Sequence, residues 1–399
     1  MMQATSRDRA WAFVALLLFP QAALAGNWYV DGSLQVDAGY DDNPLLLSDG
    51  EEGVFGTTVT PSLTLGWYAP AATVGFDLAL PYNAFSGDGV EGGGGDLDSF
   101  DQHAGSFMTL RSPLTELSLD ARYDRDTTRL SELTDSGVLS GNERRERLAG
   151  KFSVRRRLTP VDTVSLNLGI QDVSYSTSAL TDYMALDGNG EFRRNLDPRT
   201  EVGLALRLSR FDPESSSEGE THSVGLQALA AYAVSPTLDL EVAAGFSYVE
   251  RERNRLVGGV TVSDSEDAIG GLFDIAIAWE MTPVDQLQLS YNRSLQPSAT
   301  GILRTQDAIG VDYSRALTPK WSFSLSGRFL NQEAAAGSSS GAERQYFSVE
   351  PELSWQFLPQ WSLSASYRLR WQDRDTTDTA VSNAFFLTLQ YSAPRLKLY

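Results

Sequence analysis

The sequence has no cysteine and only two histidines, His103 and His222, in 399 residues. No disulfide can therefore form in an oxidising compartment, and no cysteine is available to carry a lipid anchor. A serine hydrolase would need a Ser/His/acid set. Asp101 shares a strand face with His103, but Ser106 lies on the opposite face, and the acid beside His222 is Glu220. Neither neighbourhood forms a triad locally, so an enzyme would need residues from other strands.

Long apolar runs are also missing. After the first residues no stretch of about eighteen apolar residues occurs, which excludes a membrane-spanning helix. Residues 1–25 have the organisation of a cleaved secretory signal peptide: Arg7 and Arg9 precede an apolar segment, Ala10–Phe19, and Ala23–Ala25 forms a small-residue cleavage site. The mature chain, residues 26–399, is predicted to be exported to the periplasm, the outer membrane or the medium.

What the sequence does contain is alternation of apolar and polar residues. Leu317–Leu330 begins with a Leu-Thr-Pro turn and continues with apolar residues or glycine at every second position: Trp321, Phe323, Leu325, Gly327 and Phe329. Trp361–Trp371 repeats the arrangement, with Arg368 and Arg370 among its polar positions. Period-two alternation places one strand face in an apolar medium and the other in water. Because an arginine facing lipid costs about 2–4 kcal/mol, both arginines are predicted to point inward. This orientation predicts a membrane barrel.

Short turns and longer polar connections alternate along the chain. The short turns coincide with eight prolines: Pro70, Pro113, Pro160, Pro198, Pro236, Pro283, Pro319 and Pro359. Nine longer connections lie around residues 41–54, 86–98, 127–142, 177–185, 213–219, 254–262, 297–302, 334–341 and 375–380. These connections predict an all-β fold, a transmembrane antiparallel up-and-down barrel of about 18 strands (16–18) formed by residues 26–399. Both ends of the chain would lie on the short-turn side, as in bacterial outer-membrane barrels.

A soluble β-sandwich or β-propeller is the alternative fold, because its strands alternate too. Its polar face would look outward, however. Neither fold needs aromatic residues at both ends of a strand, such as Trp28 and Tyr40, or connections of consistently unequal length. The pattern therefore favours the membrane barrel.

Charge is distributed unevenly between connections and strands. Acidic residues outnumber basic ones by 52 to 32, which gives a formal net charge of −20, and they gather in the connections. Basic residues gather at strand positions that are predicted to face the lumen: Arg122, Arg145, Arg147, Lys151, Arg155, Arg157, Arg207, Arg328, Arg368 and Arg370. They could bind carboxylates or sugar hydroxyls, or they could only form ion pairs that order the wall. The cluster Arg144–Arg157 is the best candidate for a selectivity patch. No cofactor, metal site or catalytic residue is predicted, and an acidic exported chain is not expected to bind nucleic acid.

Three features of the sequence resemble a known family. Gly39–Pro44 reads GYDDNP, Leu-Thr-Pro turns recur, and the chain ends in FFLTLQYSAPR before its last residues. This pattern resembles the β-barrel porins encoded in exopolysaccharide gene clusters, in which a Tyr-x-Asp-Asn segment, here Tyr40, Asp42 and Asn43, closes the first strand. The resemblance implies an outer-membrane conduit for a secreted polysaccharide, with a periplasmic polysaccharide-export protein as partner.

Three functions are therefore considered. A polysaccharide export pore in the outer membrane of a Gram-negative bacterium is the first, and a general or anion-preferring diffusion porin for small hydrophilic solutes is the alternative; an outer-membrane enzyme is the third. A long inward-folded loop that narrows the lumen would favour the porin, but none of the connections is conspicuously long. Expected partners are outer-membrane lipid, lipopolysaccharide, the polysaccharide itself, and the barrel-insertion machinery, which would read the aromatic end of the last strand.

Overall fold

The computed structural model describes residues 26–49, 53–87, 97–129, 142–214, 219–257, 260–299, 301–334, 343–375 and 377–398. The predicted signal peptide, residues 1–25, lies outside this part of the chain. No helix in the described ranges is long and apolar enough to cross a membrane. Its strands are β1 (Asn27–Asp41), β2 (Val54–Ala69), β3 (Ala72–Ala79), β4 (Tyr82–Ser86), β5 (Ser99–Phe100), β6 (Gln102–Arg111), β7 (Thr115–Thr127), β8 (Arg144–Arg157), β9 (Asp162–Tyr175), β10 (Tyr183–Asn195), β11 (Thr200–Pro213), β12 (Thr221–Ser235), β13 (Leu238–Val257), β14 (Val260–Thr282), β15 (Asp285–Pro297), β16 (Leu303–Thr318), β17 (Trp321–Ala334), β18 (Arg344–Leu358), β19 (Trp361–Arg374), β20 (Thr377–Ser392) and β21 (Leu396–Leu398).

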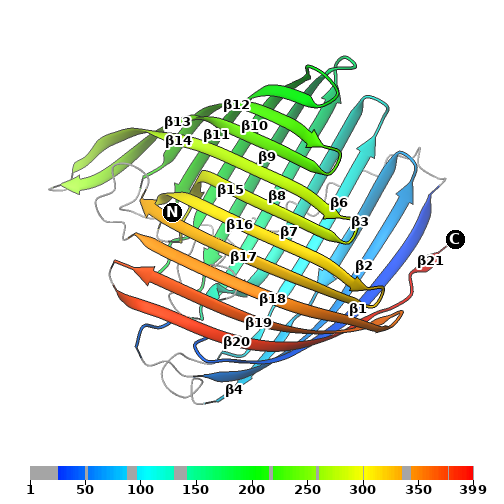
Figure 1. Cartoon of the computed structure of the whole chain (residues 1–399). Coiled ribbons are helices and arrows are strands. Elements are labelled where there is room, and N and C mark those ends of the chain that lie inside the picture. The colour runs from blue at the N-terminus through cyan, green and yellow to red at the C-terminus, as the bar shows by residue number, and fades with distance from the viewer. Residues whose placement is uncertain are drawn as a thin grey trace.

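These strands form one closed antiparallel barrel with 18 wall strands (Figure 1). Each wall strand pairs with the next along the chain, and three wall strands consist of two segments each. β3 and β4 both pair with β2, and β20 and β21 both pair with β1. β5 pairs with β4, and β6 pairs with β3. The pairing of β1 with β20 closes the ring. The predicted fold and strand number are therefore confirmed.

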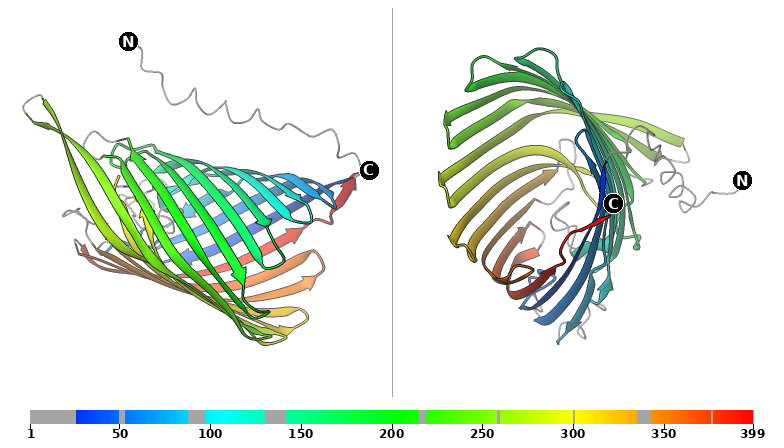
Figure 2. Two further views of the ribbon diagram at one scale, coloured as in Figure 1. Left: turned by 90° about the horizontal axis from the view of Figure 1, so that it is seen from above. Right: turned by 90° about the vertical axis from the view of Figure 1, so that its right-hand side faces the viewer.

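The two kinds of connection lie at opposite ends of the barrel, as predicted. All eight proline turns join strands at one end, where β1 begins and β21 ends. Two of the nine longer connections were predicted wrongly. Most of residues 254–262 is strand, because β13 continues to Val257 and β14 begins at Val260, and β20 already begins at Thr377. Alternation is weak in these polar segments, but backbone pairing continues. The β13–β14 hairpin consequently projects beyond the rest of the outer end (Figure 2).

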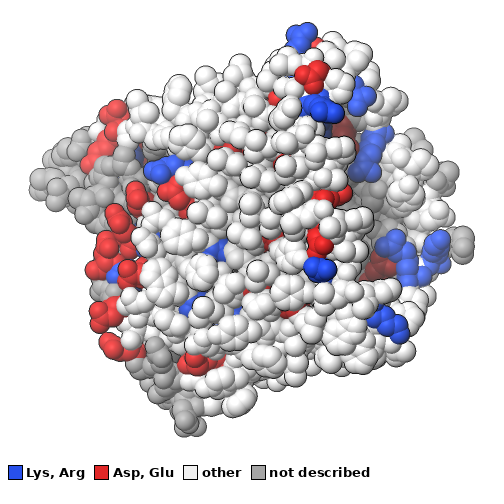
Figure 3. Space-filling model, viewed as in Figure 1, with Lys and Arg blue, Asp and Glu red and all other residues white. Residues whose placement is uncertain are grey.

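The outer surface of the barrel carries an apolar band. Large hydrophobic side chains point outward on both halves of the wall, among them Leu204, Leu206, Leu208, Phe246, Leu363 and Leu387. Aromatic rings flank the band: at the short-turn end Trp321 stacks on Trp355 with 5.4 Å between ring centroids, and at the outer end the centroids of Tyr40 and Phe55 are 4.9 Å apart. Figure 3 shows the band as a broad uncharged surface, with acidic side chains along its left, outer edge. Such a surface fits a barrel embedded in lipid.

The residues after β1 fasten the seam at which the barrel closes. β1 pairs with β20 from Ser33, opposite Ser392, to Asp41, opposite Ala384. The carboxylate of Asp42 then accepts hydrogen bonds from the backbone N–H and the side-chain amide of Asn383, at 2.6 and 2.9 Å. These bonds extend the attachment of β1 to β20 past the last ladder pair.

Asn43 turns the chain inward directly after the seam. Its Nδ2 atom donates to the carbonyl oxygens of Leu47 and Val381, at 2.8 and 3.0 Å, and its Oδ1 atom accepts from the Leu47 N–H at 2.9 Å. Leu46 adopts a positive φ of 51° inside this turn and is buried against Leu330, Tyr346 and Ala380. The Asp-Asn pair that carries the family resemblance thus holds the first connection against the inner wall.

Arg370 joins the same seam from β19. Its Nη2 atom lies 2.6 Å from Asp41 Oδ2 and also donates to the Asn43 carbonyl oxygen and to Ser382 Oγ, at 3.3 and 2.9 Å. Ser382 Oγ in turn donates to Asp41 Oδ1 at 2.7 Å. This ion pair is largely shielded from solvent, since the side chains of Arg370 and Asp41 are only 7% and 14% exposed.

Replacing Asp41 with alanine is expected to destabilise the barrel by about 3 kcal/mol, because it leaves the Arg370 charge buried without its partner. Urea unfolding of the protein in lipid vesicles measures this. Asp31→Ala is the matched control: Asp31 also pairs with an arginine, Arg395, but the two side chains are 34% and 57% exposed, so its loss is expected to cost about 1 kcal/mol or less. Equal losses in the two variants would contradict a special role for the buried pair.

Candidate channel lumen

Of the ten basic residues predicted to face the lumen, four line lumenal cavities and five others stand on strand faces that carry acids. On β8, the residues Arg145, Arg147, Lys151 and Arg155 stand opposite the β7 acids Asp126, Asp124, Asp120 and Glu116. Arg122 lies on the same face of β7, as its contact with Asp124 shows. Arg328, Arg368 and Arg370 line one lumenal cavity and Arg207 lines another. Their role in selectivity stays a prediction, because position alone does not establish it.

Four of these arginines are tied into ion pairs. Arg122 Nε lies 2.8 Å from Asp124 and Arg368 Nε lies 2.6 Å from Glu350, while Arg370 belongs to the seam. Arg207 reaches from β11 to Asp274 on β14, at 2.9 Å, and Gln227 on β12 donates to the same carboxylate. The wall between β11 and β14 must bend sharply for this contact to form. The sequence left two roles open for these arginines, solute binding and ordering of the wall. The contacts of these four residues fit the ordering role.

Another group of basic side chains remains unpaired. Within the described ranges the side chains of Lys151, Arg155, Arg157 and Arg328 are exposed and form neither an ion pair nor a hydrogen bond. Glu116, the residue opposite Arg155, pairs with Arg111 instead. Uncompensated cations inside a narrow passage raise the local concentration of anions.

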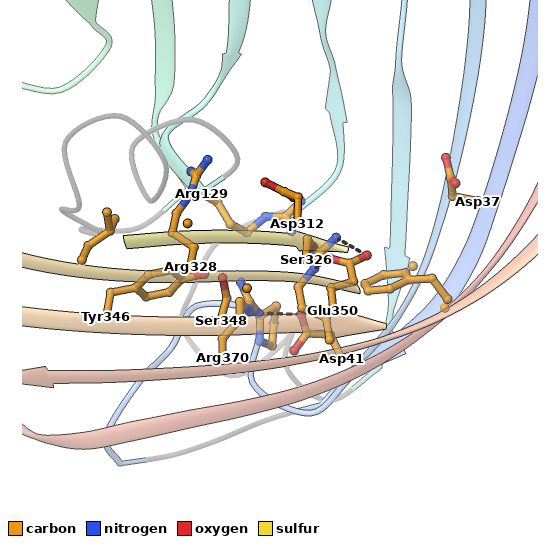
Figure 4. Close-up of a pocket in the computed structure, with 18 of the residues that line it drawn as sticks. Asp37, Asp41, Arg129, Asp312, Ser326, Arg328, Tyr346, Ser348, Glu350 and Arg370 are labelled. Atoms are coloured by element: carbon orange, nitrogen blue, oxygen red, sulfur yellow. Dashed lines mark hydrogen bonds and ion pairs between the residues drawn. The ribbon is translucent and has the colours of Figure 1, made fainter. Parts of the chain in front are cut away.

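The larger of the two lumenal cavities described has a volume of about 810 Å³ and lies along the wall on both sides of the seam (Figure 4). β1, β2 and β4 form one side, and β15 to β20 form the other. Figure 4 places Arg129, Arg328 and Arg370 around it, together with Asp312, Glu350 and Asp41. We call it the pore cavity. Its lining mixes apolar and polar side chains and carries both signs of charge.

The outer end of the β15–β16 hairpin leaves the wall. β14 pairs with β15 only as far as Phe273 opposite Arg293, whereas Ser294–Pro297 pairs with β16 alone. We call the described residues Ser294–Ala299 and Gly301–Arg304 the inward tip. The Ala299 carbonyl oxygen within it accepts a hydrogen bond of 2.8 Å from the Thr181 N–H, in the connection between β9 and β10. The tip therefore reaches a part of the wall five or more strands away.

Apolar packing holds the inward tip in place. Leu303 is buried and Leu295 is partly buried against lumenal side chains of β9, β10, β11 and β13, namely Val173, Tyr183, Ala185, Phe211 and Val249. A second cavity, of about 400 Å³, is lined by Ser294, Gln296 and Leu303 of the hairpin and by Arg207 and Ser209 of β11. The hairpin thus stands between two cavities and narrows the lumen.

The sequence did not reveal the inward tip, because the connection that carries it is short. One signal was present: Pro297 has no N–H, so β15 could not have continued a regular ladder at that position. The direction that the hairpin takes depends on which neighbouring strand loses its pairing partner. Barrel curvature sets this, not the local sequence.

Arg129 is a lumenal residue that sequence reasoning missed, because it follows β7 in a connection where strand parity does not apply. Its guanidinium carbon lies 4.5 Å from the centroid of the Phe85 ring. Its Nε and Nη2 atoms are buried and have no hydrogen-bond partner in the described chain. Burial lowers the pKa of Arg129 to about 10, and the charge of Arg370 lowers it too, whereas Asp41 and Asp101 act in the opposite direction.

The histidines belong to ion-pair networks. His103 Nδ1 lies 2.8 Å from Asp124, which also binds Arg122, and His222 Nε2 lies 2.8 Å from Glu220. Asp101 does not orient His103, because it accepts hydrogen bonds from Asn83 and Arg144 instead. Across the residues that the structure describes, no three His, Asp or Glu side chains converge as a metal site would require.

No protein-family model and no curated protein sequence matches the chain. Solved porins are similar in structure. OccK5 (OpdH) of Pseudomonas aeruginosa aligns at 8% identity over 94% of this chain and 99% of its own, with a TM-score of 0.44. A BenF-like porin of Pseudomonas fluorescens aligns at 10% identity over 93% and 99%, with a TM-score of 0.47. OpdK of P. aeruginosa, solved with vanillate, aligns at 14% identity over 92% and 99%, with a TM-score of 0.46. At these values the barrel assignment rests on the strand pairing itself.

Replacing Lys151, Arg155 and Arg157 together with serine is expected to move the ion preference toward cations, because three positive charges are lost and Asp120 no longer has Lys151 opposite it. The reversal potential across a planar bilayer with a salt gradient measures the change. The control replaces Arg199, Lys320 and Lys397 with serine, which removes the same charge from the short turns and the terminal strand. An equal shift in both variants would mean that only the total charge matters.

Proposed function

We propose that the protein is an outer-membrane channel for the passive passage of small hydrophilic solutes. The apolar band with aromatic borders fits an outer-membrane barrel, and a barrel of 16–18 strands is wide enough to leave an aqueous channel. Its inner wall carries arginines, carboxylates and hydroxyl groups, which suit a hydrated solute.

The inward tip is the observation that favours a small solute over a polymer. A conduit for a polymer needs an unobstructed passage along the whole barrel. Here the inward tip leaves β14 and contacts the wall at β9–β11, and packing of Leu303 and Leu295 fixes it there. We therefore favour a small-solute channel over the polysaccharide export pore that the family resemblance implies. For the enzyme, the third possibility, neither histidine network supplies a nucleophile.

Uptake into proteoliposomes tests this proposal. Vesicles that contain the folded protein are expected to swell in monosaccharides and disaccharides and to respond progressively less as the oligosaccharide lengthens. Rapid entry of long oligosaccharides would support the export pore instead. Vesicles that do not swell in any sugar, and that conduct no ions, would contradict a channel of either kind.

A variant without the inward tip tests the constriction directly. Deleting residues 297–303 and joining Gln296 to Arg304 through two glycines is expected to raise single-channel conductance and to extend swelling to longer oligosaccharides, because the obstruction is gone. The matched control shortens the projecting β13–β14 hairpin by deleting residues 254–263 and inserting two glycines. That hairpin lies beyond the outer end, so its removal is expected to leave conductance unchanged (Figure 2). Unchanged conductance in the tip variant would show that the narrowest point lies elsewhere.

A further inference from the structure

We propose that three arginines on the outside of the barrel, Arg156, Arg194 and Arg315, bind the phosphate groups of anionic phospholipids in the membrane leaflet at the short-turn end. The surface lies outside the lumen, so the inference does not depend on what passes through the channel. It starts from a pattern that recurs where strands enter the proline turns.

Six of the eight proline turns are preceded by the same kind of residue. Four positions before the proline stands either an arginine or a large aromatic residue: Arg156, Arg194, Tyr232, Trp279, Arg315 and Trp355. The three aromatic residues are exposed on the outside of the barrel. Tyrosine and tryptophan gather at the level of the lipid headgroups, so the three arginines at the equivalent position of their strands lie at that level too.

Strand pairing places these arginines on the lipid-facing side of the wall. Arg156 stands opposite Val164, Arg194 opposite Val202 and Arg315 opposite Phe323. Residues directly opposite each other in antiparallel strands share a face of the sheet. Two positions farther along β9 and β11, the same face carries Leu166 and Leu204, which belong to the exposed apolar band.

Apolar side chains lie on both sides of each arginine along its strand. The outward residue before it is Val154, Phe192 or Tyr313, and the one after it is Leu158, Leu196 or Leu317. These leucines are 55%, 60% and 49% exposed. Each arginine is thus held within the membrane surface rather than beyond it. An arginine facing lipid costs little at this depth, and its planar fork matches the oxygens of a phosphate group.

The protein itself neutralises the three arginines only in part. Arg156 is exposed, and its side chain has no partner in the described ranges. Arg194 Nε lies 3.7 Å from Asp162 and Arg315 Nε lies 3.5 Å from Asp285, which is too long for a strong hydrogen bond. Both carboxylates also accept hydrogen bonds from threonine hydroxyls of their own turns. Each guanidinium group can therefore take a phosphate oxygen as an additional acceptor.

The outer end of the wall carries the opposite charge. Glu250 and Asp267 stand opposite each other on the outward faces of β13 and β14, and both are exposed, as is Asp172 on β9. Figure 3 shows acidic side chains along the outer edge and several basic side chains at the opposite edge. Anionic headgroups would be repelled at the outer end, so the charge distribution fits them at the short-turn end only.

Tryptophan fluorescence of the barrel refolded in lipid vesicles tests this surface. Six of the eight tryptophans lie beside short turns: Trp28, Trp67, Trp279, Trp321, Trp355 and Trp361. A chain of residues 26–399 with Trp371→Phe therefore reports on this end alone. Brominated phosphatidylglycerol in phosphatidylcholine vesicles is expected to quench the fluorescence more strongly than brominated phosphatidylcholine does. The expected ratio of the two lipid affinities is about twofold to fivefold at low salt, the scale of one cation at a charged membrane surface.

Matched variants assign the preference to the arginines. Arg156→Gln with Arg194→Gln is expected to bring the ratio close to one, because the cations that flank β9 are gone. Arg156→Lys with Arg194→Lys keeps the charge and is expected to retain most of the preference. Lys151→Gln with Arg328→Gln removes the same charge from the lumen and is expected to leave the ratio unchanged.

Several outcomes would overturn the proposal. These are a ratio of one in the unaltered chain, a ratio that survives the glutamine changes at Arg156 and Arg194, and an equal fall in the lumenal control. High salt is expected to abolish the preference of the unaltered chain, so a salt-independent ratio would also contradict it, even without the variants. Gel mobility that changes on heating identifies folded protein. A barrel that prefers phosphatidylglycerol but conducts nothing would uphold the lipid surface and contradict the channel.

Discussion

Closure of the backbone hydrogen-bond ladder is the constraint on which the rest of this structure depends. In lipid every strand must pair on both edges, because no water is present to satisfy a free N–H or C=O group. β1 therefore has to find β20 across the whole length of the chain, and the seam carries more than its ladder: Asp42 extends it to Asn383, and Arg370 ties Asp41, Asn43 and Ser382 together from β19. The GYDDNP segment, on which the family resemblance rests, thus helps to hold the seam closed.

The same constraint explains where the lumen is narrowed. Pairing can be given up only near the outer end of the barrel, where polar solvent or protein can replace it, and β14 and β15 part there, beyond Phe273 and Arg293. The freed end of the β15–β16 hairpin instead contacts the far wall. It accepts a hydrogen bond from Thr181 and packs in the apolar cluster around Phe211. The projecting β13–β14 hairpin and the inward tip both extend from the point where β14 and β15 part.

Arginines have two different tasks in this wall. Those whose partners lie within reach, such as Arg207 with Asp274 across the bend from β11 to β14, order the barrel and leave little charge for a solute. Those whose side chains have no partner in the described ranges, such as Arg328 and Arg155, leave a positive charge at the wall. Strand parity cannot distinguish the two tasks, since both kinds occupy inward positions; only the distances to carboxylates on other strands do.

The sequence by itself determined the antiparallel barrel, a number of about 18 strands (16–18), the lipid-facing side of the strands that alternate clearly, and the end at which the short turns lie. Period-two alternation and proline turns are local features, so they can be recognised without knowledge of the fold. Tertiary structure alone decided the ion pairs of Arg370 and Arg207, the burial of Arg129 and the inward course of Ser294–Arg304. Each of these depends on residues brought together by barrel closure and curvature, over separations of tens to hundreds of positions, and no pattern within a single strand records which residues will meet.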